Sequence, residues 1–232
     1  MSKVYLVPSV LDESALQTIP TYLIDAVKDC KVIFAENERT TRRFLKSICK
    51  DIVIDDFEWF TIHKAEEEQK ISFRQKIKEG KNIAIISEAG CPGIADPGQI
   101  LVELAQQLNV IVKPLVGPSS ILLALMASGM NGQQFEFVGY LPIDNIERAK
   151  TIKEMESSSA KKNSTEIFIE TPYRNNQLIE TLLKNCKATT RICIAAELTG
   201  TNEFVKTKTV ADWQKEEIDF HKKPVIFLLQ AQ

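Results

Sequence analysis

Short apolar runs alternate with helix-patterned segments along this 232-residue chain, and this alternation limits the folds open to it. The runs "VYLVP", "KVIFAE", "NIAIIS" and "VIVKPLV" are apolar on both faces, and segments with apolar residues at helical spacing separate them. Strands of this kind are typical of a mainly parallel sheet with helices packed on both sides. The sequence therefore predicts an α/β fold.

The second half of the chain predicts a different sheet. The run "EFVKTKTV" alternates apolar and polar residues, which is typical of an antiparallel strand with one exposed face. We expect an N-terminal α/β domain over residues 1–114 with a mainly parallel sheet, and a C-terminal α/β domain over 115–232 with a mixed sheet.

Several element boundaries follow from local signals. Proline is favourable in the first turn of a helix, so we expect one helix to begin at Pro20 and another to have Pro118 at its first position. Gly80 predicts the end of a charged helix. The polar segment "SSSAKKNS" predicts an exposed loop.

Composition excludes some classes of function. The net charge of −2 gives no general attraction for nucleic acid, so an RNA-binding protein with this sequence would need a local basic cluster. Five cysteines without a CxxC pair indicate a reducing, cytoplasmic environment. Two distant histidines argue against a histidine-rich metal site, and no apolar stretch is long enough to span a membrane. We therefore expect no metal and no membrane partner.

Two glycine-containing loops are the first candidates for a binding site. "SEAGCPGIADPG" follows one predicted strand and "GPSS" follows the next, while the GxGxxG and GxxxxGK[ST] nucleotide motifs are absent. Loops at the carboxyl ends of parallel strands form the ligand crevice of open α/β sheets, and glycine there lets the backbone approach a ligand closely. The alternative is that both loops are compact turns without a ligand.

Six ordered segments resemble one protein family. "AENERTTRRFL", "SEAGCPGIADPG", "PLVGPSSILLALMASG", "FEFVGYLP", "IFIETPYR" and "AAELTG" are similar to motifs of the tetrapyrrole methylase superfamily. Within it they are most similar to the branch of ribosomal RNA small-subunit methyltransferase I, which methylates a cytidine 2′-hydroxyl. The resemblance implies two α/β domains, S-adenosylmethionine (SAM) bound in a cleft between them, and a homodimer.

The resemblance implies an enzyme, a SAM-dependent methyltransferase that acts on a ribose 2′-hydroxyl of small-subunit ribosomal RNA. Two alternatives stay open, a methyltransferase for a tetrapyrrole or another small molecule, and a degenerate relative that binds the donor or a partner protein without turnover. The small ribosomal subunit or its RNA is the partner expected under the first reading.

The resemblance also assigns residues to the donor site. Backbone donors and acceptors with an apolar slot for adenine suit SAM. The expected donor-binding residues are Pro8, Glu88, Ala89, Gly90, Ser119, Ser120, Ile169, Ala195, Ala196 and Pro224. For Ile169, Ala195, Ala196 and Pro224 the alternative is ordinary strand core.

Methyl transfer to a hydroxyl requires a group that takes the hydroxyl proton. Glu36 and Asp96 are the candidate carboxylates; the alternatives are a salt bridge between Glu36 and an arginine, and an N-cap role for Asp96 with Pro97 in the first helical position. The candidate substrate-binding residues are Arg39, Arg42, Arg43, Glu170, Arg174 and Glu197. The arginines, with Lys46, follow three- and four-residue steps and predict one basic helix face.

Several positions depart from the family pattern. The loop after the first strand keeps Pro8 but has no glycine, Asn37 stands where aspartate is usual, and Glu88 also replaces an aspartate. Cys91 replaces a threonine, and Ile169 and Tyr173 replace a tyrosine and a histidine. These departures fit a divergent paralogue with another substrate.

Overall fold

The computed structural model describes residues 2–62 and 66–232 and divides into two compact units, Met1–Ser119 (unit 1) and Ser120–Gln232 (unit 2). We expected a boundary after residue 114. That each unit is a domain able to fold by itself stays a prediction.

Unit 1 contains a five-stranded sheet in which every pair of neighbouring strands is parallel, as the apolar runs predicted. The strand order is β3-β2-β4-β1-β5. The strands are β1 (Lys3–Val7), β2 (Val32–Ala35), β3 (Glu58–Thr61), β4 (Ile83–Ile86) and β5 (Ile111–Pro114). All four residues of β2 and of β4 are buried, because these strands are packed on both faces.

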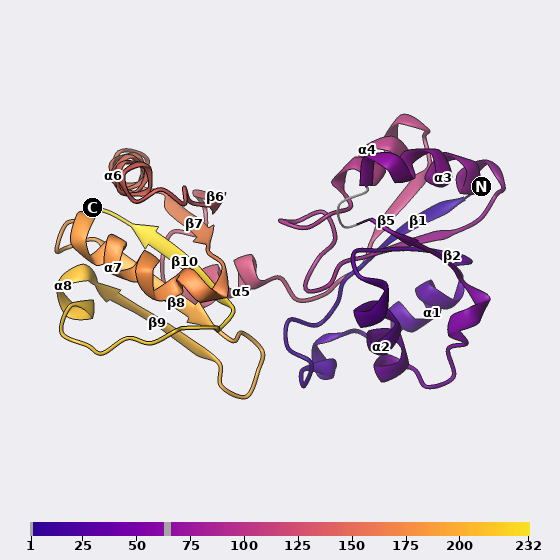
Figure 1. Cartoon of the computed structure of the whole chain (residues 1–232), viewed down its shortest axis with the longest axis horizontal. Helices are drawn as coiled ribbons and strands as arrows, with labels where there is room; N and C mark the ends of the chain where they lie inside the picture. The colour runs from indigo at the N-terminus through magenta and orange to yellow at the C-terminus, as the bar shows by residue number, and fades with distance from the viewer. Residues whose placement is uncertain (1, 63–65) are drawn as a thin grey trace. The chain divides into compact units, whose positions relative to one another are not determined.

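Helices cover both faces of this sheet, with α1 and α2 on one side and α3 and α4 on the other (Figure 1). These helices are α1 (Tyr22–Lys28), α2 (Glu38–Ile48), α3 (Glu66–Lys78) and α4 (Gln99–Gln107). Successive side chains of β2 point to opposite faces of the sheet and belong to different hydrophobic cores. Ile33 packs with Leu23 and Phe44, whereas Phe34 packs with Phe73. The 3₁₀ helices Leu16–Thr18 and Ile54–Asp56 lie in the connections.

The predicted starts of three helices are wrong, two of them in unit 1 and one at the beginning of unit 2. Helix α1 begins at Tyr22 after Thr21, not at Pro20. Helix α4 begins at Gln99 after Gly98, which has a φ of 125°, so Asp96 is not its cap residue and Pro97 is not its first residue. Helix α5 begins at Ser120, two residues after Pro118.

Unit 2 contains a mixed five-stranded sheet with the order β6-β7-β10-β8-β9. Its strands are β6 (Phe135–Tyr140), β7 (Thr165–Ile169), β8 (Arg191–Ala196), β9 (Phe204–Thr209) and β10 (Val225–Gln230). Strands β6 and β7 are parallel and the other pairs are antiparallel. The prediction that "EFVKTKTV" forms an antiparallel strand is confirmed.

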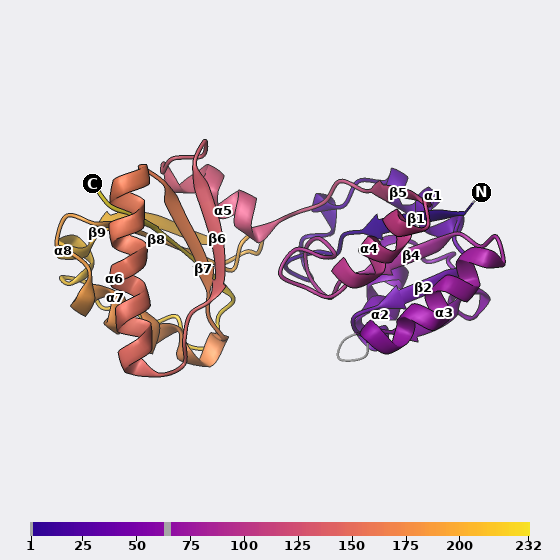
Figure 2. The same cartoon turned by 90° about the horizontal axis from the view of Figure 1, so that it is seen from above.

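The helices of unit 2 are α5 (Ser120–Ser128), α6 (Asn145–Lys162), α7 (Asn175–Asn185) and α8 (Val210–Trp213), with a 3₁₀ helix at Pro172–Arg174. Helices α6, α7 and α8 share one core with the sheet, built around Ile152, Leu178, Trp213 and Phe227 (Figures 1 and 2). No helix among the described residues is long and apolar enough to cross a membrane.

The segment "SSSAKKNS" was predicted as a loop, and this prediction is wrong because α6 continues to Lys162. Ser159 is fully buried, donates its hydroxyl to the Ser164 carbonyl at 2.6 Å and accepts the Ala231 N–H at 2.9 Å. Asn163, in the left-handed conformation with φ 51°, ends the helix. Ser159 and Ser164 are thus buried in hydrogen bonds, whereas Ser157, Lys161, Lys162 and Asn163 of the same segment are exposed.

Candidate functional site

The loops after β1 and β4 are joined at the carboxyl edge of the unit 1 sheet. Ser9 and Gly90 exchange two backbone hydrogen bonds, with N···O distances of 2.9 and 3.2 Å. The Ser9 hydroxyl donates to the Ser87 carbonyl at 2.8 Å, and the Ser87 hydroxyl donates to the Gly90 carbonyl at 2.9 Å. The paired strand ends therefore fix the conformation of the loop that carries Glu88, Ala89 and Gly90.

The loop after β5 packs against the same structure. A β-carbon at Gly117 would overlap the ring of Pro8, so glycine is required there by close approach. Gly90 has a φ of 71°, and a β-carbon on it would lie 3.3 Å from Leu11 Cδ2. The Cys91 thiol donates to the Pro118 carbonyl at 3.5 Å.

These three loops bring five predicted donor-binding residues of unit 1 to one edge, namely Pro8, Glu88, Ala89, Gly90 and Ser119. Pro8 and Gly90 are buried, whereas Glu88 and Ala89 are exposed. The backbone N–H groups of Ala89 and Ser119 have no hydrogen-bond partner among the described residues. Free backbone donors beside a glycine are what a polar ligand needs.

Three carboxylates gather at this edge. Glu36 follows β2 directly, and its Oε2 accepts the backbone N–H of Glu88 at 2.8 Å. Glu88 Oε1 accepts a hydrogen bond from the Asn37 side chain at 3.2 Å, and Asn37 Oδ1 also caps α2 through Arg39 N–H at 3.1 Å. Burial, together with the negative charges of Glu36 and Glu88, raises the pKa of Asp96 to about 7.

The carboxylates suit an organic cation better than a metal ion. Among the described residues there is no group of three or more His, Cys, Asp or Glu side chains that is arranged to hold a metal. The negative charges at this edge suit the sulfonium of a methyl donor, and free backbone N–H groups suit its polar atoms. These residues therefore fit SAM.

The predicted basic face of α2 is only partly free. Arg42 pairs with Glu38 at 2.7 Å and lies 4.8 Å from the centre of the Trp59 ring, so its side chain is engaged in structural contacts. Arg43, 62% exposed, lies 3.7 Å from Glu13. Arg39 is exposed and its side chain has no ion-pair partner among the described residues. The side chains of Arg42 and Arg43 thus contact different elements.

In unit 2, Ile169, Ala195 and Pro224 lie at one end of the sheet. Ile226 of β10 pairs with Ile169 on one side and with Ala195 on the other, and Pro224 immediately precedes β10. Ala196 belongs to the core shared with α6 and α7, so its side chain lies on the opposite face from that of Ala195. Ser120 is the first residue of α5.

The three predicted substrate-binding residues of unit 2 follow the same strand ends. Glu170 is buried, and its Oε1 accepts hydrogen bonds from the Arg174 guanidinium at 2.6 and 3.0 Å. Glu197, in a left-handed conformation with φ 50°, pairs with Lys223 at 2.9 Å. Both carboxylates are therefore neutralised by a neighbouring cation.

Some residues at these edges were missed by sequence reasoning. Ser9 and Ser87 carry the loop hydrogen bonds, and neither was a candidate residue although Ser87 opens the segment "SEAGCPGIADPG". Tyr173 is 70% exposed, its ring centre lies 6.0 Å from that of His221, and Lys222 Nζ lies 5.9 Å from it. The aromatic Tyr173 beside Arg174 was the available signal for this second group.

Comparison with protein families gives one match that spans most of the chain. Residues 16–214 match the model of the Tetrapyrrole (Corrin/Porphyrin) Methylases. A Buchnera aphidicola (subsp. Schizaphis graminum) protein named ribosomal RNA small subunit methyltransferase I is 30% identical over 97% of this chain and 76% of its own length. Proteins of the same name from Vibrio cholerae and Bacillus subtilis are 31% and 32% identical, over 98% and 94% of this chain and 76% and 72% of their own lengths.

Solved structures with the same fold include two methyltransferases. The methyltransferase CobJ superposes with a TM-score of 0.65 at 14% identity, over 100% of this chain and 95% of its own. A uroporphyrin-III-C-methyltransferase from Thermus thermophilus superposes with a TM-score of 0.57 at 16% identity, over 99% of this chain and 92% of its own. At these identities the likeness concerns the two-unit α/β fold.

Proposed function

Because the chain belongs to the tetrapyrrole methylase family, we propose that it is a SAM-dependent methyltransferase that methylates a ribose 2′-hydroxyl of small-subunit ribosomal RNA. The observation that carries the proposal is the relatives named ribosomal RNA small subunit methyltransferase I, which are 30–31% identical over 97–98% of this chain. The solved tetrapyrrole methyltransferases share only 14–16% identity, so they favour no tetrapyrrole acceptor.

The donor site would be built on the loops at the carboxyl edge of the unit 1 sheet. Ala89 and Ser119 offer unpaired backbone N–H groups, and Gly90 lets the loop approach a ligand. When bound, SAM supplies a methyl group on a positively charged sulfur, which becomes a neutral thioether when the methyl group moves to an oxygen. The negative charges of Glu36 and Glu88 favour a cation at this edge.

Asp96 is the residue we assign to the proton of the acceptor hydroxyl. Formation of the C–O bond releases that proton, and a carboxylate whose pKa is about 7 can both exist ionised near neutral pH and accept it. Glu36 instead holds the Glu88 N–H at 2.8 Å, so we assign it a positioning role for the loop. Positioning of the hydroxyl in line with the methyl group supplies much of the rate in such a displacement.

An RNA acceptor also agrees with the exposed groups near the strand ends of unit 2. Single-stranded RNA bases stack on aromatic side chains and on arginine planes. Tyr173 is 70% exposed, with His221 and Lys222 beside its ring. We assign this group to a base of the substrate.

Methyl transfer to purified small ribosomal subunits tests the proposal. Labelled SAM should transfer methyl groups to the RNA, and the modified position should become resistant to alkaline cleavage, because that cleavage requires a free 2′-hydroxyl. The Asp96→Asn variant should bind SAM and transfer slowly, while Asp51→Asn, at an exposed position, should behave as wild type. Methylation of a base, or donor binding without transfer to any RNA, would contradict the proposal.

A further inference from the structure

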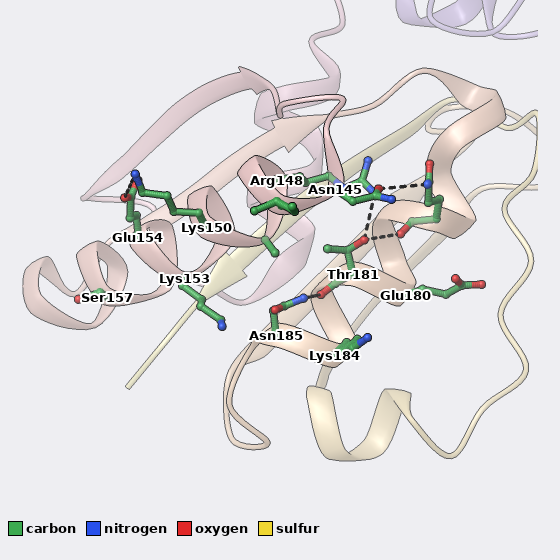
Figure 3. Close-up of a pocket in the computed structure, with 13 residues that line it drawn as sticks. Asn145, Arg148, Lys150, Lys153, Glu154, Ser157, Glu180, Thr181, Lys184 and Asn185 are labelled. Carbon is green, nitrogen blue, oxygen red and sulfur yellow. Dashed lines mark hydrogen bonds and ion pairs between the residues drawn. The ribbon is translucent and has the colours of Figure 1, made fainter.

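Helices α6 and α7 border an open pocket of about 990 Å³ in unit 2 (Figure 3). Six charged residues line it, namely Arg148, Lys150, Lys153, Lys184, Glu154 and Glu180. The pocket is separate from the strand ends described above, because it lies along the outer helices. We call it the α6–α7 groove.

Arg148 at this groove is a buried cation without a carboxylate partner. Its side chain is 1% exposed, and its guanidinium donates to the Ile143 carbonyl, the Asn145 side chain at 2.6 Å and the Thr181 hydroxyl at 3.2 Å. All three acceptors are neutral, and its Nε has no hydrogen-bond partner among the described residues. A buried charge without a counterion is costly, so the surroundings favour an anion.

Two further cations at the groove are unpaired. Lys153 of α6 and Lys184 of α7 have no carboxylate within 4 Å among the residues that the structure describes. Figure 3 shows Lys153 extending from α6 toward α7, whereas Glu180 points away from α6. Lys150 lies 3.9 Å from Glu154, so this pair is partly neutralised. Four cations and two carboxylates make the lining net positive on a chain whose net charge is −2.

We propose that the α6–α7 groove binds phosphate groups of the RNA backbone, with Lys153 and Lys184 as direct contacts and Arg148 as the buried charge behind them. This inference rests on the proposed function, because it takes its ligand from the RNA substrate. Guanidinium and ammonium groups are the side chains that bind phosphate, and an open groove admits a chain of phosphates more readily than it encloses a small molecule. Because the groove lies outside the strand ends, we assign it a role in RNA affinity and none in the methyl transfer itself.

The test is RNA binding by a Lys153→Ala, Lys184→Ala double variant across a salt series. Loss of two phosphate contacts should lower the slope of log K against log[salt] by about 1.4–1.8 units. Between 1 M and 0.1 M salt the affinity of the variant should therefore rise roughly 25- to 60-fold less than that of the wild type. The matched control is Lys28→Ala with Lys78→Ala, which removes the same charge from two exposed helical lysines of unit 1. The control should change the slope little.

Donor calorimetry and methyl transfer to small subunits are measured on the same samples. If the wild type methylates RNA and the groove variant binds RNA with the same affinity and slope as the control variant, the groove proposal fails and the proposed function stands. If the wild type neither methylates nor binds RNA at low salt, both fail. If inorganic pyrophosphate raises the melting temperature of the wild type but not of the groove variant, while RNA affinity matches the control, the groove binds free anions and the RNA proposal is overturned.

Discussion

Burial and two neighbouring carboxylates, Glu36 and Glu88, both raise the pKa of Asp96. Its pKa of about 7 means that the folded protein holds a proton which the unfolded chain releases at much lower pH. The protonated form therefore stabilises the folded state below about pH 4, and this contribution is lost as the pH rises through 7. The same raised pKa that lowers the stability of the folded protein at neutral pH suits the proton-transfer role that we propose for Asp96.

The first prediction concerns this titration. Asparagine at position 96 cannot ionise, so the difference in melting temperature between Asp96→Asn and the wild type should shift in favour of the variant between pH 5 and pH 8. Thermal unfolding followed by circular dichroism at the two pH values measures it, with Asp51→Asn as the control. An unchanged difference at both pH values would mean that Asp96 has an ordinary pKa.

The second prediction concerns Gly90. Valine at this position would face a φ of 71° and a contact 3.3 Å from Leu11, so the loop would shift. A strain of roughly 1–3 kcal/mol is enough to weaken SAM binding about tenfold or more if the loop forms the donor site. Titration calorimetry compares Gly90→Val with Cys91→Ser, which should bind as the wild type does. Equal affinities in a folded Gly90→Val protein would remove this loop from the donor site.

Sequence reasoning named candidate residues that the structure brings to one edge of the unit 1 sheet, but it gave none of their contacts. The glycines and carboxylates after the apolar runs indicated the edge of the sheet, because strand ends and turn residues are local signals. The link between two departures from the family pattern was not visible, since Asn37 donates to Glu88 across 51 positions of the chain. An aspartate at position 37 would set a second carboxylate against Glu88. Arg42 was predicted as a substrate contact because its contacts with Trp59 and Asp55 join distant parts of the chain, although its pairing with Glu38, four residues earlier, was visible in the sequence.

At the scale of elements, strands were predicted better than the ends of helices. An apolar run needs only burial on both faces, which the sequence displays directly. Helix ends depend on how the free N–H groups of the first turn are met: the Asn37 side chain accepts two of them before α2, whereas Thr21 before α1 and Gly98 before α4 make no side-chain cap. None of these three residues was recognised from the sequence. Helix α6 was predicted too short because the partner of Ser159, Ala231, lies 72 residues away.

The third prediction tests the buried serine of α6. Ser159→Ala removes the acceptor of the Ala231 N–H and the donor to the Ser164 carbonyl, so it should lower the free energy of unfolding by about 1–3 kcal/mol. Urea unfolding measures the loss. Ser157→Ala, at an exposed position two residues earlier on the same helix, should change it by less than about 0.5 kcal/mol. Equal losses would show that the Ser159 hydrogen bonds contribute nothing specific.

At the scale of the whole molecule, the family resemblance leads us to propose a homodimer. Exposed apolar side chains on α5, with Leu122 at 52% and Met126 at 78% exposed, leave a surface that a partner would cover. The fourth prediction is therefore a sedimentation mass of about twice 26.2 kDa at micromolar concentration. The Met126→Glu variant should shift the equilibrium toward the monomer, while Glu103→Gln on α4 should not. A wild-type monomer throughout this range would exclude the dimer.

The division of the chain into two contiguous units has a consequence for how the protein is made. Unit 1 ends at Ser119, so every strand of its parallel sheet has been synthesised before any residue of unit 2, Ser120–Gln232, is added. At roughly 5–20 residues per second, on the order of 6–23 seconds pass before Gln232 of unit 2 is joined. If unit 1 folds by itself, as we predict, the edge that carries Glu36, Glu88 and Asp96 forms on the ribosome while unit 2 is still being translated.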